Sequence, residues 1–243
     1  MRHLPHAMVH CAPSRNYTIV KKLGKGQFGE RFAWKQVTSE QDPYYEVEAQ
    51  ILRDLHHDGI VSIVEAYSQD GVVDMVLELC QKSLQFDMDS RLEPAPMTGK
   101  KQYMRPRSCD IASTMEQLLA AVYFLHENGV SHRDIKPDNV LMSVGDLAME
   151  HTKGHQTCQA GLCRKGGTWK LADFGLATRF NRGSYMTGEV GTQPFMAPEV
   201  EQRHYTEKCD IYSRLPAIGM GVLFIALTIG KQWWRPESDS APQ

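Results

Sequence analysis

The residues in this 243-residue sequence that first suggest chemistry are three closely spaced glycines, Gly24, Gly26 and Gly29, in the segment GKGQFG. Glycines at this spacing let backbone amides approach phosphate groups without obstruction by side chains. The pattern alone is weak support, because an ordinary hairpin also uses glycines in its turn. A phosphate-binding interpretation therefore depends on the residues further along the chain.

Five further features come after the glycines in a fixed order. They are Lys35 in FAWK, Glu48 on the next predicted helix, SHRDIKPDN at 131–139, ADFG at 172–175 and MAPE at 196–199. An isolated Asp or Asn in a loop is usually a turn residue, but chance does not produce this ordered series. The series resembles that of the eukaryotic protein kinases, and the resemblance runs from about residue 17 to the end of the chain.

The resemblance implies transfer of the γ-phosphoryl group of ATP with the help of Mg²⁺. Asp134 would accept the proton of the substrate hydroxyl, and Lys136 would contact the γ-phosphate. The lysine of HRDIKPDN and the GT of GTQPFMAPE are similar to those of serine/threonine kinases, so protein Ser or Thr is the expected acceptor. The expected ligands of the magnesium ions are Asn139 and Asp173.

Lys35 would hold the α and β phosphates, and Glu48 would orient it through an ion pair. Glu48 is preferred to Glu46 because it shares a helical face with Leu52 and Leu55. Leu77 matches the gatekeeper of the family, and the residues after it match the hinge that binds adenine through its backbone. The resemblance assigns the nucleotide to Gly24, Lys25, Gly26, Gly29, Ala33, Lys35, Leu77, Glu78, Cys80, Asn139 and Asp173.

Arg133 precedes the expected catalytic aspartate, as in kinases that are switched by phosphorylation of the activation loop. Ser184 and Thr187 are the candidate phosphorylation sites. Leu52, Ile63, His132 and Phe174 match the stacked apolar column that couples the two lobes of such kinases.

The elements that would position these residues are predicted from the hydrophobic pattern. Strands are expected at 17–23, at FAWKQV, at 60–67 and at 72–79, with a helix over 45–55. Residues 80–109 have little periodicity and predict a loop or linker. A strong amphipathic stripe then predicts a helix that ends at Asn128 and Gly129. Its members are Ile111, Met115, Leu118, Leu119, Val122 and Leu125.

The expected fold is α+β, with the two lobes of a protein kinase: a tail over 1–16, a β-rich small lobe over 17–79 and a mainly helical large lobe over 80–243. Four departures from the family pattern stand out. Too few residues separate Gly29 from Lys35 for the family's second strand, and Arg31 replaces a valine above adenine. An insertion occupies 143–169, and the last helices of the large lobe are expected to be absent.

Composition limits the classes of partner. With 27 basic and 29 acidic residues, the net charge of −2 gives no field that would attract nucleic acid or an anionic membrane. The resemblance to protein kinases implies protein substrates as the partners. Scattered cysteines and the lack of a signal-like start favour free thiols and an intracellular location, cytoplasmic or nuclear. The apolar run 215–230 is shorter than the roughly 20 residues of a membrane span, and Pro216 predicts a late or kinked start of its helix.

Three alternatives remain open, and one is a membrane-tethered form that uses residues 215–230 with Trp233 and Trp234 at the interface. His151, His155, Cys158 and Cys163 lie within the insertion and could bind zinc, although polar loops often contain such residues by chance. The departures from the family pattern also allow a catalytically silent, kinase-like fragment that acts by binding a partner.

Overall fold

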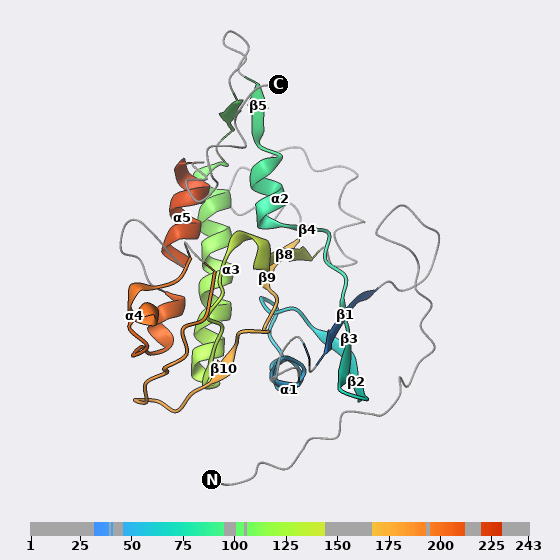
Figure 1. Ribbon diagram of the computed structural model, residues 1–243. Helices are drawn as coiled ribbons and strands as arrows, with labels where there is room; N and C mark the ends of the chain where they lie inside the picture. Colours follow the sequence, from blue (N-terminus) through green and yellow to red (C-terminus); the bar gives the residue numbers. More distant parts are fainter. Residues whose placement is uncertain are drawn as a thin grey trace.

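The computed structural model describes residues 32–38, 40, 46–94, 101–104, 106–143, 167–192, 195–211 and 220–229. The glycine loop, Arg31, the strand expected at 17–23 and the four His and Cys residues of the insertion lie outside these ranges. In Figure 1 a three-stranded sheet and helix α1 form one part of the molecule, and a larger helical part surrounds α3. This arrangement confirms the expected α+β fold with a β-rich and a helical lobe.

The sheet consists of three antiparallel strands in the order β1-β3-β2. These are β1 (Phe32–Thr38), β2 (Ile63–Gln69) and β3 (Val72–Glu78). β-branched residues and aromatics are frequent in them, which suits a half-buried pleated surface. Strands β2 and β3 are joined by a turn at Asp70 and Gly71, both with positive φ. The strand pair expected around QDG is confirmed, although β2 begins at Ile63 rather than at Ile60.

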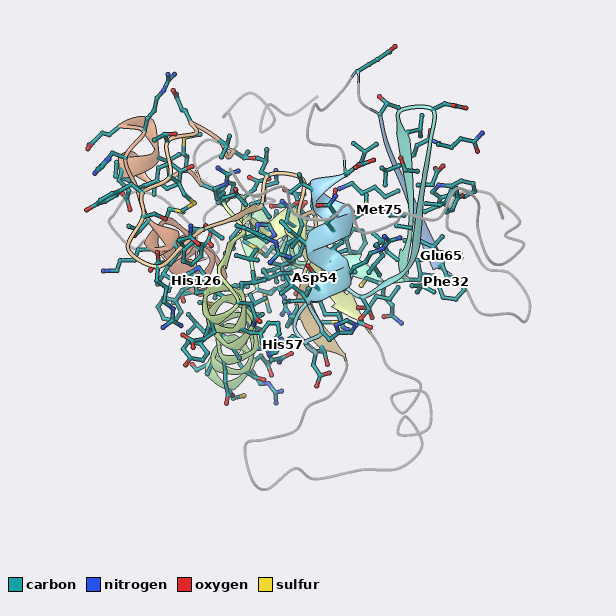
Figure 2. The ribbon with its side chains drawn as sticks, turned by 90° about the horizontal axis from the view of Figure 1, so that it is seen from below. Phe32, Asp54, His57, Glu65, Met75 and His126 are labelled. Atoms are coloured by element: carbon teal, nitrogen blue, oxygen red, sulfur yellow. The ribbon has the colours of Figure 1, made fainter. Side chains whose placement is uncertain are left out.

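Helix α1 (Val47–Asp54) lies between the sheet and the helical lobe, as Figure 2 shows. Its buried residues contact both sides. Ala49 packs with Met75 in the core beneath the sheet, whereas Ile51 and Leu52 belong to the main core of the molecule. The helical spacing therefore carries one face of α1 into the space between the lobes, and the expected helix is confirmed.

The segment after the sheet is more ordered than its sequence predicts. Residues 80–109 contain β4 (Lys82–Ser83), α2 (Leu84–Asp89), β5 (Leu92–Pro94) and β6 (Lys101–Tyr103). Ser83 caps α2, because its side-chain oxygen accepts a hydrogen bond from the Phe86 amide at 3.1 Å. The linker prediction was wrong here, because six residues are too few for a helical period to be visible.

Helix α3 (Ser108–Glu127) is the long central helix of the larger lobe (Figure 1). Ile111, Leu118, Val122 and Leu125 are buried as predicted. Leu119, however, is 43% exposed, so its place in the predicted stripe was wrong. The buried face instead includes Thr114 and Ala121, which are small enough to allow close packing.

Short strands after α3 form the base of the candidate site. They are β7 (Val130–Ser131), β8 (Val140–Ser143), β9 (Thr168–Leu171) and β10 (Thr178–Arg179), with a 3-10 turn η1 (Pro137–Asn139). β8 and β9 pair antiparallel on either side of the insertion. Gly167 precedes β9 with φ +65°, and an added Cβ there would lie 2.5 Å from the Ser143 carbonyl oxygen. The close approach of the two strands therefore requires glycine.

The last described elements are α4 (Pro198–Glu201), the 3-10 turn η3 (Glu207–Asp210) and α5 (Met220–Ile229). Met220 and Leu227 of α5 join the main core, in agreement with the expected buried helix. Pro216 lies outside the described residues. Of the helices in the described ranges, none has the length and apolar character needed to span a membrane.

Candidate active site

Lys35 lies at the centre of a group of charges between the lobes. Its ammonium group donates to both carboxylate oxygens of Glu48, at 2.8 and 2.7 Å, and to Asp173 Oδ1 at 2.6 Å. Strand β1 supplies the lysine and α1 supplies the glutamate. Glu48 Oε1 also accepts from the Phe174 amide at 3.1 Å. The pair expected between Lys35 and Glu48 is therefore present in the structure, and Asp173 joins it.

Electrostatics keep this group charged. Burial opposes the charge on Lys35, but Glu48 and Asp173 outweigh it and raise the pKa of the lysine above its ordinary value. Burial likewise disfavours the Asp173 carboxylate, yet the neighbouring Lys35 charge lowers its pKa below the ordinary range. At neutral pH Lys35 is therefore an ammonium group and Asp173 is a carboxylate.

Asp134 is the centre of a second cluster and is 5% exposed. Asn139 Nδ2 donates to Asp134 Oδ2 and to its backbone oxygen, both at 2.9 Å, and Lys136 Nζ lies 2.8 Å from Oδ2. Thr192 Oγ1 donates to Asp134 Oδ1 at 2.7 Å and accepts from Lys136 Nζ at 2.7 Å. The structure thus brings the three predicted residues of the 131–139 motif together, and it adds Thr192.

Asp210 supports the backbone that carries Asp134. Its buried carboxylate accepts from the amides of His132 and Arg133, at 2.9 and 2.7 Å. Ser131 Oγ donates to it at 3.0 Å, and His126 Nε2 lies at 2.9 Å. Burial alone would raise the pKa of Asp210, but the bond to His126 and the other donors lower it.

Two residues of the site have backbone conformations that are uncommon for side chains with a Cβ. Arg133 has φ 66° and Asp173 has φ 62°. Such left-handed residues cost on the order of 1–2 kcal/mol each and persist only where their surroundings hold them. The Asp210 bonds hold the first, and the charge group around Lys35 holds the second.

The apolar column expected between the lobes is consistent with the packing. His132 and Phe174 meet edge to face with ring centroids 4.8 Å apart. Leu52 belongs to the same buried core as Phe174, and Ile63 packs against that core. The column therefore links the loop that carries His132 to α1 and the sheet.

Of the residues assigned to the adenine end, Ala33 lies on the edge strand β1, Leu77 and Glu78 lie on the central strand β3, and Cys80 follows β3. Ala33 is the register partner of Leu77, and Phe32 is the partner of Glu78. The Glu78 side chain points to other protein groups: Oε1 accepts from the Ser62 amide and from Lys170 Nζ, each at 2.7 Å. Burial, together with the Glu78 charge, raises the pKa of Cys80 to about 11, so this thiol stays neutral.

Sequence reasoning missed three contributors to the site. In the sequence, Thr192 indicated only that the phosphate acceptor is serine or threonine, and no pattern pointed to His126 or Lys170. Their partners lie 58, 84 and 92 residues away in the chain, so spacing offers no signal for these contacts. Gly24, Lys25, Gly26 and Gly29 lie outside the described residues. Ser184 and Thr187 are both exposed on the loop that comes after Asp173.

Comparison with known proteins places this geometry in a family. The model of the protein kinase domain matches residues 16–242. The serine/threonine-protein kinase PEPKR2 of Arabidopsis thaliana is 28% identical over 227 residues, which cover 88% of this chain and 40% of that protein.

Two further relatives are calcium-dependent protein kinase 24 of Arabidopsis thaliana and calcium-dependent protein kinase 11 of Oryza sativa subsp. japonica. Each is 32% identical, with 81% of this chain and 32% of the relative covered. The chain thus spans less than half the length of these relatives. The match over nearly the whole chain, on a site built from Lys35, Glu48, Asp134 and Asp173, shows that the protein belongs to the protein kinase family, among its serine/threonine members.

Proposed function

We propose that this chain transfers the γ-phosphoryl group of ATP to serine or threonine hydroxyls of protein substrates. The observation that carries the proposal is Lys35 held between Glu48 and Asp173, because this ion pair between the sheet and α1 is the arrangement that kinases need for catalysis. The Asp134 cluster supports it independently, since a buried carboxylate there can accept a proton.

Asp134 acts as the group that orients the acceptor hydroxyl and takes up its proton. Lys136 lies 2.8 Å from its carboxylate and places positive charge where the phosphoryl group arrives. Thr192 fixes the other carboxylate oxygen, so Asp134 is restrained on both sides. Catalysis by such a site comes mainly from positioning and from electrostatic stabilisation.

The residues expected to hold Mg²⁺ suit that ion. Both amide hydrogen bonds from Asn139 Nδ2 go to Asp134, so the Asn139 side-chain oxygen is the atom left for a cation. The lowered pKa of Asp173 keeps its carboxylate ionised. Hard oxygen donors of these two kinds are those Mg²⁺ prefers. When bound, the ion supplies positive charge that neutralises the oxygens of the transferred phosphoryl group.

The nucleotide end is assigned to Ala33, Leu77, Glu78 and Cys80 together with the glycine loop. The side chain of Glu78 is committed to Ser62 and Lys170, so backbone groups are what this stretch offers to adenine. Lys35 lies two residues after Ala33 on β1 and reaches the phosphates from there. In this proposal the adenine binds beside Glu78 and Cys80, and the phosphates lie near Asp173.

We also propose Ser184 and Thr187 as phosphorylation sites on the activation segment, defined here as residues 173–199. Both are exposed, and Gly188, next to Thr187, lies close to the guanidinium of Arg133. A phosphate on Thr187 would gain charge-assisted hydrogen bonds there.

The proposed activity is tested by incubating the purified 243-residue chain with Mg-ATP and a generic Ser/Thr-rich protein, with phosphorylated residues identified by mass spectrometry. Asp134→Asn, purified identically, is the matched control. Phosphoserine or phosphothreonine that appears with the wild type and is lost in the variant supports the proposal. A folded wild-type chain without transfer would instead favour a silent, partner-binding protein.

A further inference from the structure

The hydroxyl of Tyr205 joins two segments that are far apart in sequence. Arg133 Nη1 donates to the hydroxyl at 3.2 Å, and the hydroxyl donates to the Gly188 carbonyl oxygen at 2.5 Å. We propose that Tyr205 is a positioning residue that holds the activation segment against Arg133 without any phosphate. This inference rests on the proposed kinase function and concerns how the same site is kept in order.

The chemistry of the bridge requires a hydroxyl. A guanidinium can only donate hydrogen bonds, and a carbonyl oxygen can only accept them. A group between them must accept on one side and donate on the other, which the tyrosine hydroxyl does. Phenylalanine at this position keeps the ring but can do neither, so removal of one oxygen atom breaks the bridge.

The protein fixes Tyr205 from several directions. The residue is 1% exposed and packs with Met186, Ala197 and Val200. Its backbone also pairs with Met186, at 2.7 and 3.2 Å. Burial raises the pKa of the phenol, so the hydroxyl keeps the proton that it donates to Gly188 at neutral pH. The ring is therefore an anchor with little freedom, and its hydroxyl has a defined direction.

Arg133 links two points of the activation segment, one near its start and one near its middle. Its Nε donates to the Leu176 carbonyl oxygen at 2.7 Å, just beyond Asp173. Its Nη1 reaches Gly188 through Tyr205, just before Thr192. An added Cβ at Gly188 would lie 3.3 Å from Nη1, which shows how closely the backbone approaches the guanidinium. One arginine thus contacts the segment between Asp173 and Thr192, the two residues of it that meet Lys35 and Asp134.

This arrangement makes the phenol and a phosphate two alternative anchors for the segment. A phosphate on the adjacent Thr187 could bind the same guanidinium, but the neutral bridge already supplies an anchor in its absence. The unphosphorylated chain should therefore have an ordered activation segment and substantial activity. Phosphorylation would then strengthen an order that exists rather than create it.

The test compares the phosphatase-treated wild type with Tyr205→Phe, and Tyr123→Phe serves as a matched control that loses an exposed hydroxyl on α3. Hydrogen–deuterium exchange of the amides at 184–192, without nucleotide, measures the order of the segment. Loss of a buried hydrogen bond to a charged group changes such an equilibrium by roughly 10-fold or more, so exchange should accelerate by about that factor in Tyr205→Phe alone.

Kinetics give the second readout. The phosphatase-treated wild type should transfer phosphate, and Tyr205→Phe should lower kcat by roughly 10-fold while KM for ATP stays unchanged, because the nucleotide contacts are not touched. Three results would overturn the proposal: unchanged exchange in Tyr205→Phe, acceleration that is equally large in α3, or loss of activity on phosphatase treatment of the wild type. If no protein transfers phosphate, the kinase proposal fails, and the exchange data still decide the role of Tyr205.

Discussion

Substitution of Asp210 by Asn should destabilise the fold through the backbone of the loop that contains His132 and Arg133. The carboxylate is 2% exposed and accepts from five donors: three at Oδ2, and at Oδ1 the Arg133 amide and, more weakly at 3.9 Å, the Cys209 thiol. An amide nitrogen at Oδ1 would face the Arg133 amide and leave that donor unpaired. If the amide nitrogen stood at the Oδ2 position instead, it would face three donors. The orientation with the nitrogen at the Oδ1 position therefore costs less.

The magnitude depends on that orientation. An unpaired buried donor costs about 1–3 kcal/mol. The three remaining bonds change from charged to neutral acceptors, which are about half as strong, so together they lose roughly 2 kcal/mol. The free energy of unfolding should therefore fall by about 3–5 kcal/mol. For a domain of this size, that corresponds to a decrease in Tm of roughly 6–20 °C.

Urea and thermal unfolding of Asp210→Asn measure this loss, and Asp54→Asn is the control. Asp54 is 63% exposed and paired with Arg179, so the same change there should cost no more than about 1 kcal/mol. Equal Tm values for Asp210→Asn and the wild type would show that the buried carboxylate does not hold the loop.

The effect also has a predictable dependence on pH. Because the pKa of Asp210 is lowered in the folded protein, its contribution is complete above the ordinary aspartate pKa of about 4. The contribution is lost as the pH falls through the folded pKa. The stability difference between the wild type and Asp210→Asn should therefore be constant at neutral pH and shrink below about pH 4. A difference that grows on acidification would contradict this sign.

Three further substitutions test separate contacts. Thr192→Val removes the hydroxyl between Asp134 and Lys136 and should lower kcat roughly 10- to 100-fold in steady-state assays, with KM for ATP unchanged. Lys170→Met leaves the half-buried Glu78 carboxylate without its ion pair and should lower the free energy of urea unfolding by about 1–3 kcal/mol. Gly167→Ala introduces a Cβ 2.5 Å from the Ser143 oxygen and should lower Tm, whereas Gly183→Ala, with open space around it, should cost less.

The sequence predicted those parts of the site that depend on local spacing. Glu48 could be chosen over Glu46 because helical periodicity puts it on the face of Leu52, and the structure places it on Lys35. Glu46 instead accepts a hydrogen bond from Ser68. Asp134 and Asn139 were likewise expected to lie together, because they are only 5 residues apart in the motif at 131–139 and this limits the distance between them.

Contacts across the fold that lie outside the family motifs could not be predicted from the sequence. Nothing near Tyr205 indicates that its hydroxyl meets Arg133, since the two are 72 residues apart. Helix α2 was missed because its 6 residues are too few to show a helical period. The exposure of Leu119 was predicted wrongly because it depends on which elements cover α3. From hydrophobicity alone, Leu119 is expected to be more buried than Ala121. In the structure the smaller Ala121 is the buried residue.

The kinase activity proposed for this chain is tested most sharply by phosphoryl transfer by the wild type, Lys35→Met and Asp134→Asn, measured side by side at saturating Mg-ATP on the same protein substrate. The arrangement around these residues predicts transfer by the wild type and a loss of at least roughly 100-fold in each variant, because one loses phosphate positioning and the other loses the proton acceptor. Transfer that survives unchanged in both variants, or a folded wild type that transfers nothing, would contradict the proposed activity.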